Sequence, residues 1–158
     1  MITAVDTNAL LAILYEDTHT DASEAALREA YQAGKVVTTP IVYAELAADG
    51  HFDTDSELSQ FLKDFSIQLA EPSRGALFQA GQQFQRYVAR RPDGFQCPSC
   101  GTEQTVTCVA CDDDLTSRQH IAADFVIGGH AVADADGLIS FDNGFYETYF
   151  PSLTVKPR

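Results

Sequence analysis

Short apolar runs alternate along the chain with longer segments in which apolar residues recur every three or four positions. Such runs are typical of buried strands, and the longer spacing is typical of helices that pack one face inward. The pattern predicts strands at 2–5, 36–39, 67–69, 138–141 and 153–155. It predicts helices at 7–14, 22–33, 40–49, 54–65, 72–91 and 118–133, with a short one from 143. Alternating strands and helices predict an α/β fold with a central parallel sheet covered on both faces.

Several predicted helices carry recognisable signals at their ends. Pro40 suits a first helical position, and Thr54 and Glu57 have the spacing of a capping box. Gly34 and Gly50 follow the last periodic residues of two helices, where glycine commonly ends a helix. These signals agree with the helix ranges that the apolar pattern predicts.

Four carboxylates occur at suggestive places in this pattern. Asp6 and Asp142 follow predicted strands, Glu45 lies one turn inside a helix that follows a strand, and Asp124 lies in an otherwise apolar helix. Ligands of open α/β sheets bind at the carboxyl ends of the strands, so these residues are candidates for chemistry. Asp6 has a second interpretation, because Asp is also a common helix N-cap. A buried Asp such as Asp124 is unfavourable unless it is paired or binds a cation.

Carboxylate clusters with few basic partners hold Mg²⁺ or Mn²⁺, which need hard oxygen ligands. Four stretches around these residues also resemble the PIN-domain ribonucleases, and within them the short VapC-type toxins of prokaryotic toxin–antitoxin pairs. The stretches are VDTNALLAIL, TTPIVYAEL, HIAADFVIGGHA and LISFDNGFYETYFPSL. The resemblance covers nearly the whole chain except its cysteine segment. It implies one PIN domain over 1–158, a three-layer α/β/α sandwich interrupted by a small insertion at 93–114.

The resemblance also implies an activity and a set of site residues. It implies a metal-dependent endoribonuclease in which Asp6, Asp124 and Asp142 hold one or two Mg²⁺ or Mn²⁺ ions. Glu45 then binds a metal through water or orients the nucleophile. Asn8 and Ser140 match positions where the family often has small polar groups that hydrogen-bond the ligands. A helix cap and a turn residue are the alternative interpretation of these two residues.

The resemblance extends to partners. It implies an RNA substrate, a small VapB-like antitoxin whose tail occupies the pocket, and a homodimer. A second functional hypothesis stays open, in which the chain is a PIN module that binds RNA or a partner in RNA processing with little or no nuclease activity.

The cysteine segment departs from the short VapC pattern. Cys97 and Cys100 form one Cys-x-x-Cys pair, and Cys108 and Cys111 form a second pair seven residues further on. Two such pairs can surround one tetrahedral Zn²⁺, so we expect a closed, structural Cys₄ zinc knuckle. Disulfides and a redox Cys-x-x-Cys are the alternatives. We also expect residues 102–107 to form a minimal β-hairpin, and Asp112 to occupy the position of a positive-φ knuckle residue.

Arginines concentrate on either side of this insertion. They are Arg86, Arg90 and Arg91 before it and Arg118 after it, four of the chain's ten basic residues. Such a concentration suits contact with an RNA backbone beside the carboxylates. Solvated arginines that pair with nearby aspartates are the competing interpretation.

The overall charge limits the partners that can be inferred. The chain of 158 residues has 23 acidic and 10 basic residues, a net charge of −13, and only three lysines. This balance argues against binding dominated by phosphate contacts, or it indicates a haloarchaeal-type surface whose self-repulsion is screened at molar salt. A basic protein partner is the competing interpretation. No leader or membrane-spanning run is evident, so we expect a cytoplasmic protein with no membrane association.

Overall fold

A parallel sheet of five strands forms the centre of the protein. The computed structural model describes residues 1–90, 95–96, 102–115 and 122–157. The strands of the sheet are β1 (Ile2–Val5), β2 (Lys35–Thr38), β3 (Ile67–Leu69), β8 (Gly137–Ile139) and β9 (Val155–Lys156). Their order is β3-β2-β1-β8-β9, and every neighbouring pair is parallel. The predicted α/β fold with a central parallel sheet is confirmed.

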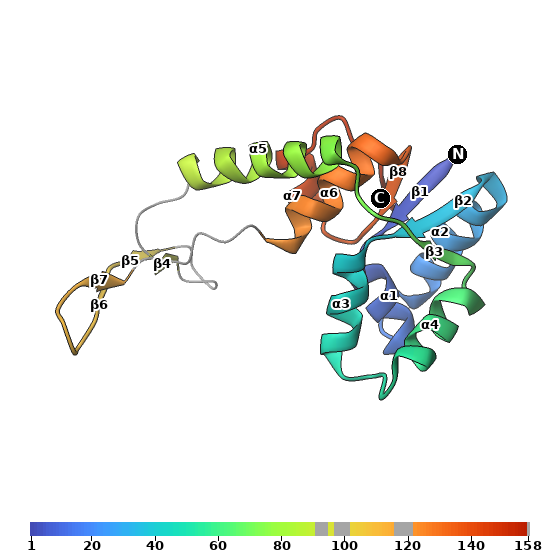
Figure 1. The fold of residues 1–158 in the computed structure, drawn as a ribbon, viewed down its shortest axis with the longest axis horizontal. Coiled ribbons are helices and arrows are strands. Elements are labelled where there is room, and N and C mark those ends of the chain that lie inside the picture. Colours follow the sequence, from blue (N-terminus) through green and yellow to red (C-terminus); the bar gives the residue numbers. More distant parts are fainter. Residues whose placement is uncertain (91–94, 97–101, 116–121, 158) are drawn as a thin grey trace.

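Helices cover this sheet on both sides. They are α1 (Thr7–Leu14), α2 (Thr20–Ala33), α3 (Pro40–Asp49), α4 (Asp55–Asp64), α5 (Arg74–Arg90), α6 (Ala123–Asp134) and α7 (Asn143–Tyr149). From β1 to β3 the chain adds strands on one side of β1, and after β3 it adds β8 and β9 on the other side. Because crossovers between parallel strands are right-handed, this change of direction places α5 to α7 on the face opposite α1 to α4. Figure 1 shows this division, with α5, α6 and α7 gathered on one side of the strands.

The helix boundaries follow from the sequence signals. Pro40 is the first residue of α3, and the Thr39 side chain accepts a hydrogen bond from the Val42 backbone N–H. Both hydrogen bonds of the capping box at Thr54 are present. Gly50 ends α3 with φ of 83°, a left-handed conformation that glycine adopts without a steric penalty.

In the segment predicted to be an insertion, the described residues form four two-residue strands that lie away from the sheet, beyond the C-terminal end of α5 (Figure 1). They are β4 (Phe95–Gln96), β5 (Glu103–Gln104), β6 (Val106–Thr107) and β7 (Asp114–Leu115). β4 pairs with β5 and β6 pairs with β7, both antiparallel. The prediction of a hairpin within 102–107 is therefore wrong. Only Thr105 separates β5 from β6, and a tight hairpin needs about two loop residues, so each strand pairs outward instead.

The helices α5 and α6 approach each other closely because a glycine lies at their contact. A Cβ atom added at Gly129 would lie 2.5 Å from the Ala76 carbonyl oxygen and 3.0 Å from the Ala80 side chain. This packing fixes the position of α6, whose first turn carries Asp124. The helix predicted over 118–133 begins at Ala123 in the structure, because Ala122 is its extended N-cap residue, and residues 118–121 lie outside the described part of the chain.

Candidate active site

The register of the two central strands brings Asp6 and Ser140 together. Val5 pairs with Ile139, so the residues that follow them lie side by side at the carboxyl edge of the sheet. The Ser140 hydroxyl donates to Asp6 Oδ2 at 2.7 Å, and the two residues are 0% and 3% exposed. Asp6 Oδ1 also accepts the Thr7 backbone N–H at 2.7 Å, which caps α1. Asp6 therefore caps a helix and belongs to the carboxylate site at the same time.

Asn8 connects the start of α1 with the end of β8. Its Nδ2 lies 3.1 Å from Asp6 Oδ2 and 3.0 Å from Ser140 Oγ. Its Oδ1 accepts the Phe141 backbone N–H at 3.0 Å. Both small polar residues singled out in the sequence thus contact the Asp6 carboxylate.

Tyr146 is the site residue that the sequence did not single out. It lies fully buried on α7, and its hydroxyl donates to Asp6 Oδ2 at 3.1 Å. Burial, together with the charges of Asp6 and Asp124, raises the pKa of Tyr146, so its hydroxyl remains a donor at neutral pH. Tyr146 stands four residues after Asp142, one helical turn away, and this spacing is the signal that could have identified it.

Burial raises the pKa of the Asp6 carboxyl group above its ordinary value. Hydrogen bonds from Ser140, Thr7 and Tyr146 act in the opposite direction, because they stabilise the ionised form. The nearby charge of Glu45 adds a smaller upward contribution. Asp6 is thus a buried carboxyl group whose ionised form is stabilised by hydrogen-bond donors. Its ionisation still costs free energy unless a positive charge is nearby.

Glu45 contacts the start of α1 from the neighbouring helix α3. It lies half-buried on α3, and its Oε2 accepts a hydrogen bond from the Thr7 hydroxyl. Because Thr7 directly follows Asp6, this contact brings the third helix to the start of the first one. The same contact holds the charge of Glu45 near Asp6, where it raises the pKa of Asp6.

Asp142 and Asp124 complete the set of four. Asp142 caps α7, with its Oδ1 accepting the Phe145 backbone N–H at 3.2 Å, and its own backbone N–H donates to Ser140 Oγ at 3.1 Å. Asp124 is half-buried in the first turn of α6. Burial, then the charges of Asp6 and Asp142, raise the pKa of Asp124. The charges of two carboxylates from distant parts of the sequence therefore act on Asp124.

The chemistry of this donor set fits a hard divalent cation. Among the described residues, the ion pairs are His130 with Asp134 and Lys156 with Glu29, so none of the four site carboxylates is neutralised there by a basic side chain. No three His, Cys, Asp or Glu side chains in the described ranges lie close enough to hold one metal directly. Mg²⁺ commonly uses one or two carboxylates and keeps several waters, which suits this looser arrangement.

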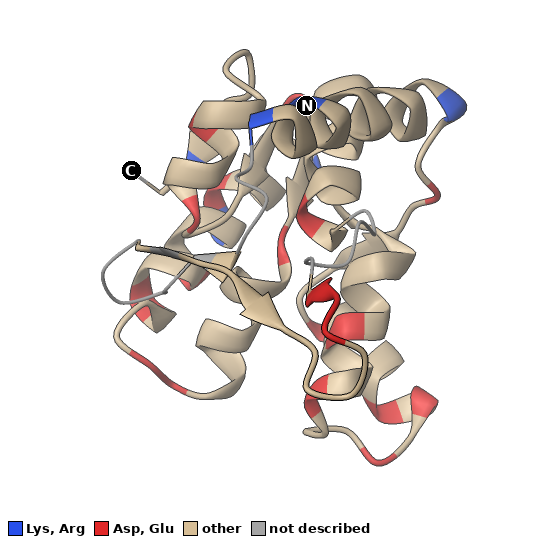
Figure 2. Ribbon diagram, turned by 90° about the vertical axis from the view of Figure 1, so that its left-hand side faces the viewer, with Lys and Arg blue, Asp and Glu red and all other residues tan. Residues whose placement is uncertain are grey.

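The predicted RNA-contacting arginines are only partly described. Arg86 and Arg90 are exposed on the last two turns of α5, and Arg86 Nη1 lies 3.3 Å from Gln83 Oε1. Arg91 and Arg118 lie outside the described residues. Figure 2 shows Asp and Glu on most elements of the side that carries the insertion, and Lys and Arg at few places.

The four cysteines are also only partly described. Cys97 and Cys100 lie outside the described residues, whereas Cys108 and Cys111 are free thiols in a tight turn. The Asp112 backbone N–H donates to the Cys108 carbonyl at 2.9 Å, and Asp112 has the positive φ of 59° expected for its place. Backbone hydrogen bonds from Ala110 and Cys111, together with the Cys111 side chain, lower the pKa of the Cys108 thiol.

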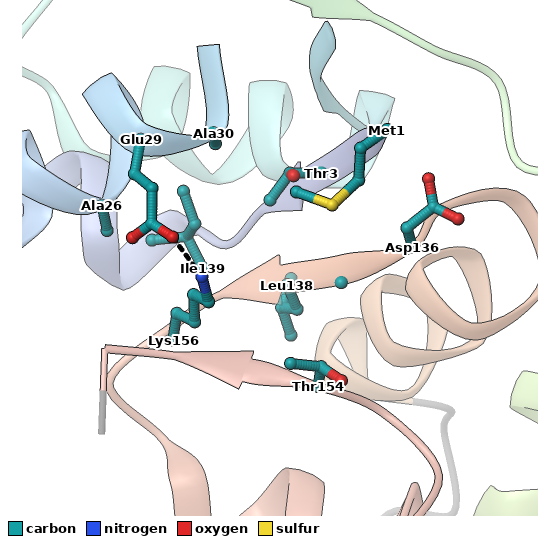
Figure 3. A pocket seen from close by; sticks show the side chains of 11 residues that line it. Met1, Thr3, Ala26, Glu29, Ala30, Asp136, Leu138, Ile139, Thr154 and Lys156 are labelled. Carbon is teal, nitrogen blue, oxygen red and sulfur yellow. Dashed lines mark hydrogen bonds and ion pairs between the residues drawn. The ribbon is translucent and has the colours of Figure 1, made fainter. Parts of the chain in front are cut away.

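A hollow lies apart from the carboxylates. It has a volume of about 280 Å³ and lies between α2 and strands β1, β8 and β9 (Figure 3). Thr3 and Ala30 line it, and Lys156 Nζ lies 2.5 Å from Glu29 Oε1 at its wall. None of the four site carboxylates lines this hollow, so it is not part of the candidate site.

Comparisons with known proteins agree with this architecture. The family model of the PIN domain matches residues 3–151. Among solved structures, VapBC2 from Rickettsia felis bound to a DNA fragment from its promoter has a TM-score of 0.62 and 17% identity, covering 99% of this chain and 98% of that one. VapBC-1 from nontypeable Haemophilus influenzae has a TM-score of 0.57 and 15% identity, covering 99% and 97%. A search of curated proteins gave no significant match.

The helices were also compared with the length and hydropathy that a bilayer requires. Within the described ranges, none is both long and apolar enough to cross a membrane.

Proposed function

Because this chain belongs to the PIN domain family, a family of nucleases, we propose that it is a Mg²⁺- or Mn²⁺-dependent endoribonuclease and the toxin of a VapBC-type pair. One observation carries the proposal. Asp6 and Asp142 follow the neighbouring strands β1 and β8 at the carboxyl edge of the parallel sheet, and their charges lie close enough to Asp124 to raise its pKa.

The residues of the site divide the chemical work. When bound, divalent cations activate a water molecule and stabilise the negative charge that develops on the phosphate and the leaving oxygen. Asp6, Asp124 and Asp142 would hold the cations, and Glu45 would orient the attacking water. Asn8 and Ser140 hold the Asp6 carboxylate in one orientation through the hydrogen bonds described above.

Cleavage of a defined RNA tests this proposal. A labelled RNA incubated with Mn²⁺ or Mg²⁺ should be cut by the wild type, and Asp142→Asn should reduce the rate by at least 100-fold. Asp21→Asn is the matched control, because Asp21 is exposed in the first turn of α2 and away from the site. Equal rates for Asp142→Asn and the wild type would contradict the proposal.

The proposed antitoxin partner is supported by the fold likeness to two VapBC structures. Expression of the wild type should then arrest growth, and Asp6→Asn should abolish the arrest while Asp21→Asn preserves it. Co-expression of a small antitoxin encoded beside the gene should restore growth. We also propose a homodimer, which sedimentation of the purified protein tests.

A second candidate function has its own support. The turn at Cys108 and Cys111, with positive φ at Asp112, lies in the cysteine segment that the short VapC pattern lacks, and it favours an RNA- or partner-binding module with little or no nuclease activity. Tight RNA binding without cleavage, unchanged by Asp142→Asn, would favour this function over the first.

The exposed arginines at the end of α5 support an RNA contact in either case. Replacement of Arg86 and Arg90 with Ala should weaken RNA binding and reduce the salt dependence by about one counterion for each lost contact. Arg28→Ala, on the exposed face of α2, is the matched control. Equal salt slopes for the double variant and the control would count against this contact.

We propose further that the insertion holds one structural zinc ion. The turn at Cys108 and Cys111, with positive φ at Asp112 and backbone N–H groups donating to the Cys108 sulfur, supports half of a zinc knuckle. Purified wild type should contain about one zinc per chain, and Cys108→Ser with Cys111→Ser should contain none. Asp6→Asn should keep the zinc, since it alters a different site. A zinc-free wild type with oxidised cysteines would favour disulfides instead.

A further inference from the structure

The two oxygens of the Asp6 carboxylate have unequal surroundings. Oδ2 accepts three hydrogen bonds, from the Ser140 hydroxyl at 2.7 Å, Asn8 Nδ2 at 3.1 Å and the Tyr146 hydroxyl at 3.1 Å. Oδ1 accepts one, from the Thr7 backbone N–H at 2.7 Å. A carboxylate offers about four lone-pair directions in all, roughly two on each oxygen. Oδ2 is therefore fully used by the protein, and Oδ1 keeps a free direction.

We propose that Tyr146 is a positioning residue that, with Ser140 and Asn8, commits Oδ2 of Asp6 to the protein, so that Asp6 binds a divalent cation through Oδ1 alone. This inference rests on the proposed metal-dependent function and adds the binding mode of one ligand. Without the Tyr146 hydroxyl, Oδ2 keeps the Ser140 and Asn8 donors but loses the contact from α7 that opposes rotation of the carboxylate, which could then turn to present both oxygens.

The surroundings of Tyr146 suit a positioning role. The side chain is 0% exposed, and its ring lies against Phe145 and Phe150 with centroids 5.1 and 6.2 Å away. The hydroxyl is the polar end of an otherwise apolar side chain, so its single direction of contact is fixed by the packing of the ring. The Asp6 carboxylate oxygen is the hydrogen-bond partner that the structure gives this hydroxyl.

Tyr146 also lies on α7, the helix that is capped by Asp142, a second candidate metal ligand. The Tyr146 backbone N–H donates to the Asp142 carbonyl at 3.3 Å, and Asp142 caps the helix on which Tyr146 lies. Phe145 next to it packs edge-on against Phe125, the residue after Asp124, with centroids 5.0 Å apart. The aromatic cluster of Phe125, Phe145, Tyr146 and Phe150 therefore links the backbone positions of three candidate ligands.

Single-oxygen binding has a consequence for which cation the site prefers. Ca²⁺ accepts six to eight ligands and often binds carboxylates through both oxygens, whereas Mg²⁺ and Mn²⁺ suit octahedral sites with single-oxygen ligands. A carboxylate held to one available oxygen therefore disfavours Ca²⁺. Loss of the Tyr146 hydroxyl should reduce this discrimination.

Cation binding by Tyr146→Phe tests the proposal with the full-length protein. Mn²⁺ and Ca²⁺ affinities would be measured by Mn²⁺ electron paramagnetic resonance, with Ca²⁺ as competitor. Tyr146→Phe should weaken Mn²⁺ binding by about tenfold, as loss of an outer hydrogen bond to a metal ligand commonly does, and weaken Ca²⁺ binding much less. Tyr149→Phe is the matched control, because it removes a hydroxyl from the same helix without touching Asp6.

The possible results separate this inference from the proposed function. If the wild type binds no Mn²⁺, both are overturned. If the wild type binds Mn²⁺ and Tyr146→Phe keeps the same ratio of Mn²⁺ to Ca²⁺ affinity, only the positioning role is overturned. Ser140→Ala removes another donor from Oδ2 and should shift the ratio in the same direction, so it serves as the second variant if Tyr146→Phe does not fold.

Discussion

Replacement of Ser140 with Ala tests the hydrogen-bond network around Asp6 more sharply than removal of a carboxylate does. The Ser140 side chain is fully buried and joins three groups: its hydroxyl donates to Asp6 and accepts from Asn8 Nδ2 and the Asp142 backbone N–H. Hydrogen bonds to charged groups contribute about 1.5–3 kcal/mol, and neutral ones about 0.5–1.5 kcal/mol. We therefore expect Ser140→Ala to lower the free energy of unfolding by about 3 kcal/mol at pH 7.5.

The pH dependence of this loss identifies its cause. Burial raises the pKa of Asp6, and the Ser140 hydrogen bond lowers it, so the variant should have a still higher Asp6 pKa in the folded state. The folded variant then binds its proton more readily than the wild type. The difference in unfolding free energy between wild type and Ser140→Ala should have its full value at pH values above the folded-state Asp6 pKa of both proteins. It should shrink to about 1 kcal/mol as the pH falls below both folded-state pKa values, where Asp6 is protonated in both folded proteins.

Urea unfolding in metal-free buffer at a series of pH values measures this difference. Ser23→Ala provides the matched control, because Ser23 is equally buried and its hydroxyl donates to the Ala9 carbonyl at 2.6 Å, away from the carboxylates. Its loss should be about 1 kcal/mol and independent of pH. A loss for Ser140→Ala that matches the control, or that stays constant with pH, would refute this account of the network.

Three further predictions concern the electrostatics and packing of the protein. Asp124→Asn should stabilise the metal-free protein at neutral pH, because burial and neighbouring charges raise the pKa of Asp124 in the folded state. That gain should disappear as the pH falls toward 3.8, the ordinary pKa of Asp, and saturating Mn²⁺ at neutral pH should reverse it. Urea titrations at neutral pH and near pH 3.8 check this prediction. Gly129→Ala should destabilise the protein by about 1–3 kcal/mol, because its Cβ would meet the Ala76 carbonyl, whereas Gly81→Ala, where the space is open, should not destabilise it in the same assay. The melting temperature should rise between 0.1 and 1 M KCl, because the screening length falls from about 10 to about 3 Å around a net charge of −13; an unchanged melting temperature would contradict the halophilic interpretation.

Most of the fold followed from periodicity, because strands buried on both faces and capped helices leave local signals. The Thr54 capping box, Pro40 at the start of α3 and the order of strands and helices were all predicted and observed. Pairing within the insertion was not predictable, since two-residue strands carry almost no periodic signal. The spacing around Thr105 excludes a hairpin there only once the strand boundaries are known.

The site illustrates a different limit of sequence reasoning. Helix cap and carboxylate site are competing interpretations of Asp6 in the sequence, yet in the structure one oxygen caps α1 while the other receives the site's hydrogen bonds. Tyr146 escaped prediction because it lies in the aromatic run FYETYF, where each ring fits the core equally well. Only the packing of α7 shows which of these hydroxyls reaches a carboxylate.

The most direct test of the proposed nuclease site measures Mn²⁺ binding and RNA cleavage together for the wild type, Asp124→Asn and Asp21→Asn. Asp124 is decisive because it reaches the site from α6, far in the sequence from Asp6, and its pKa responds to both other carboxylates. The account predicts that Asp124→Asn loses Mn²⁺ affinity and cleavage, while Asp21→Asn keeps both. Mn²⁺-dependent cleavage at the wild-type rate by Asp124→Asn would contradict it.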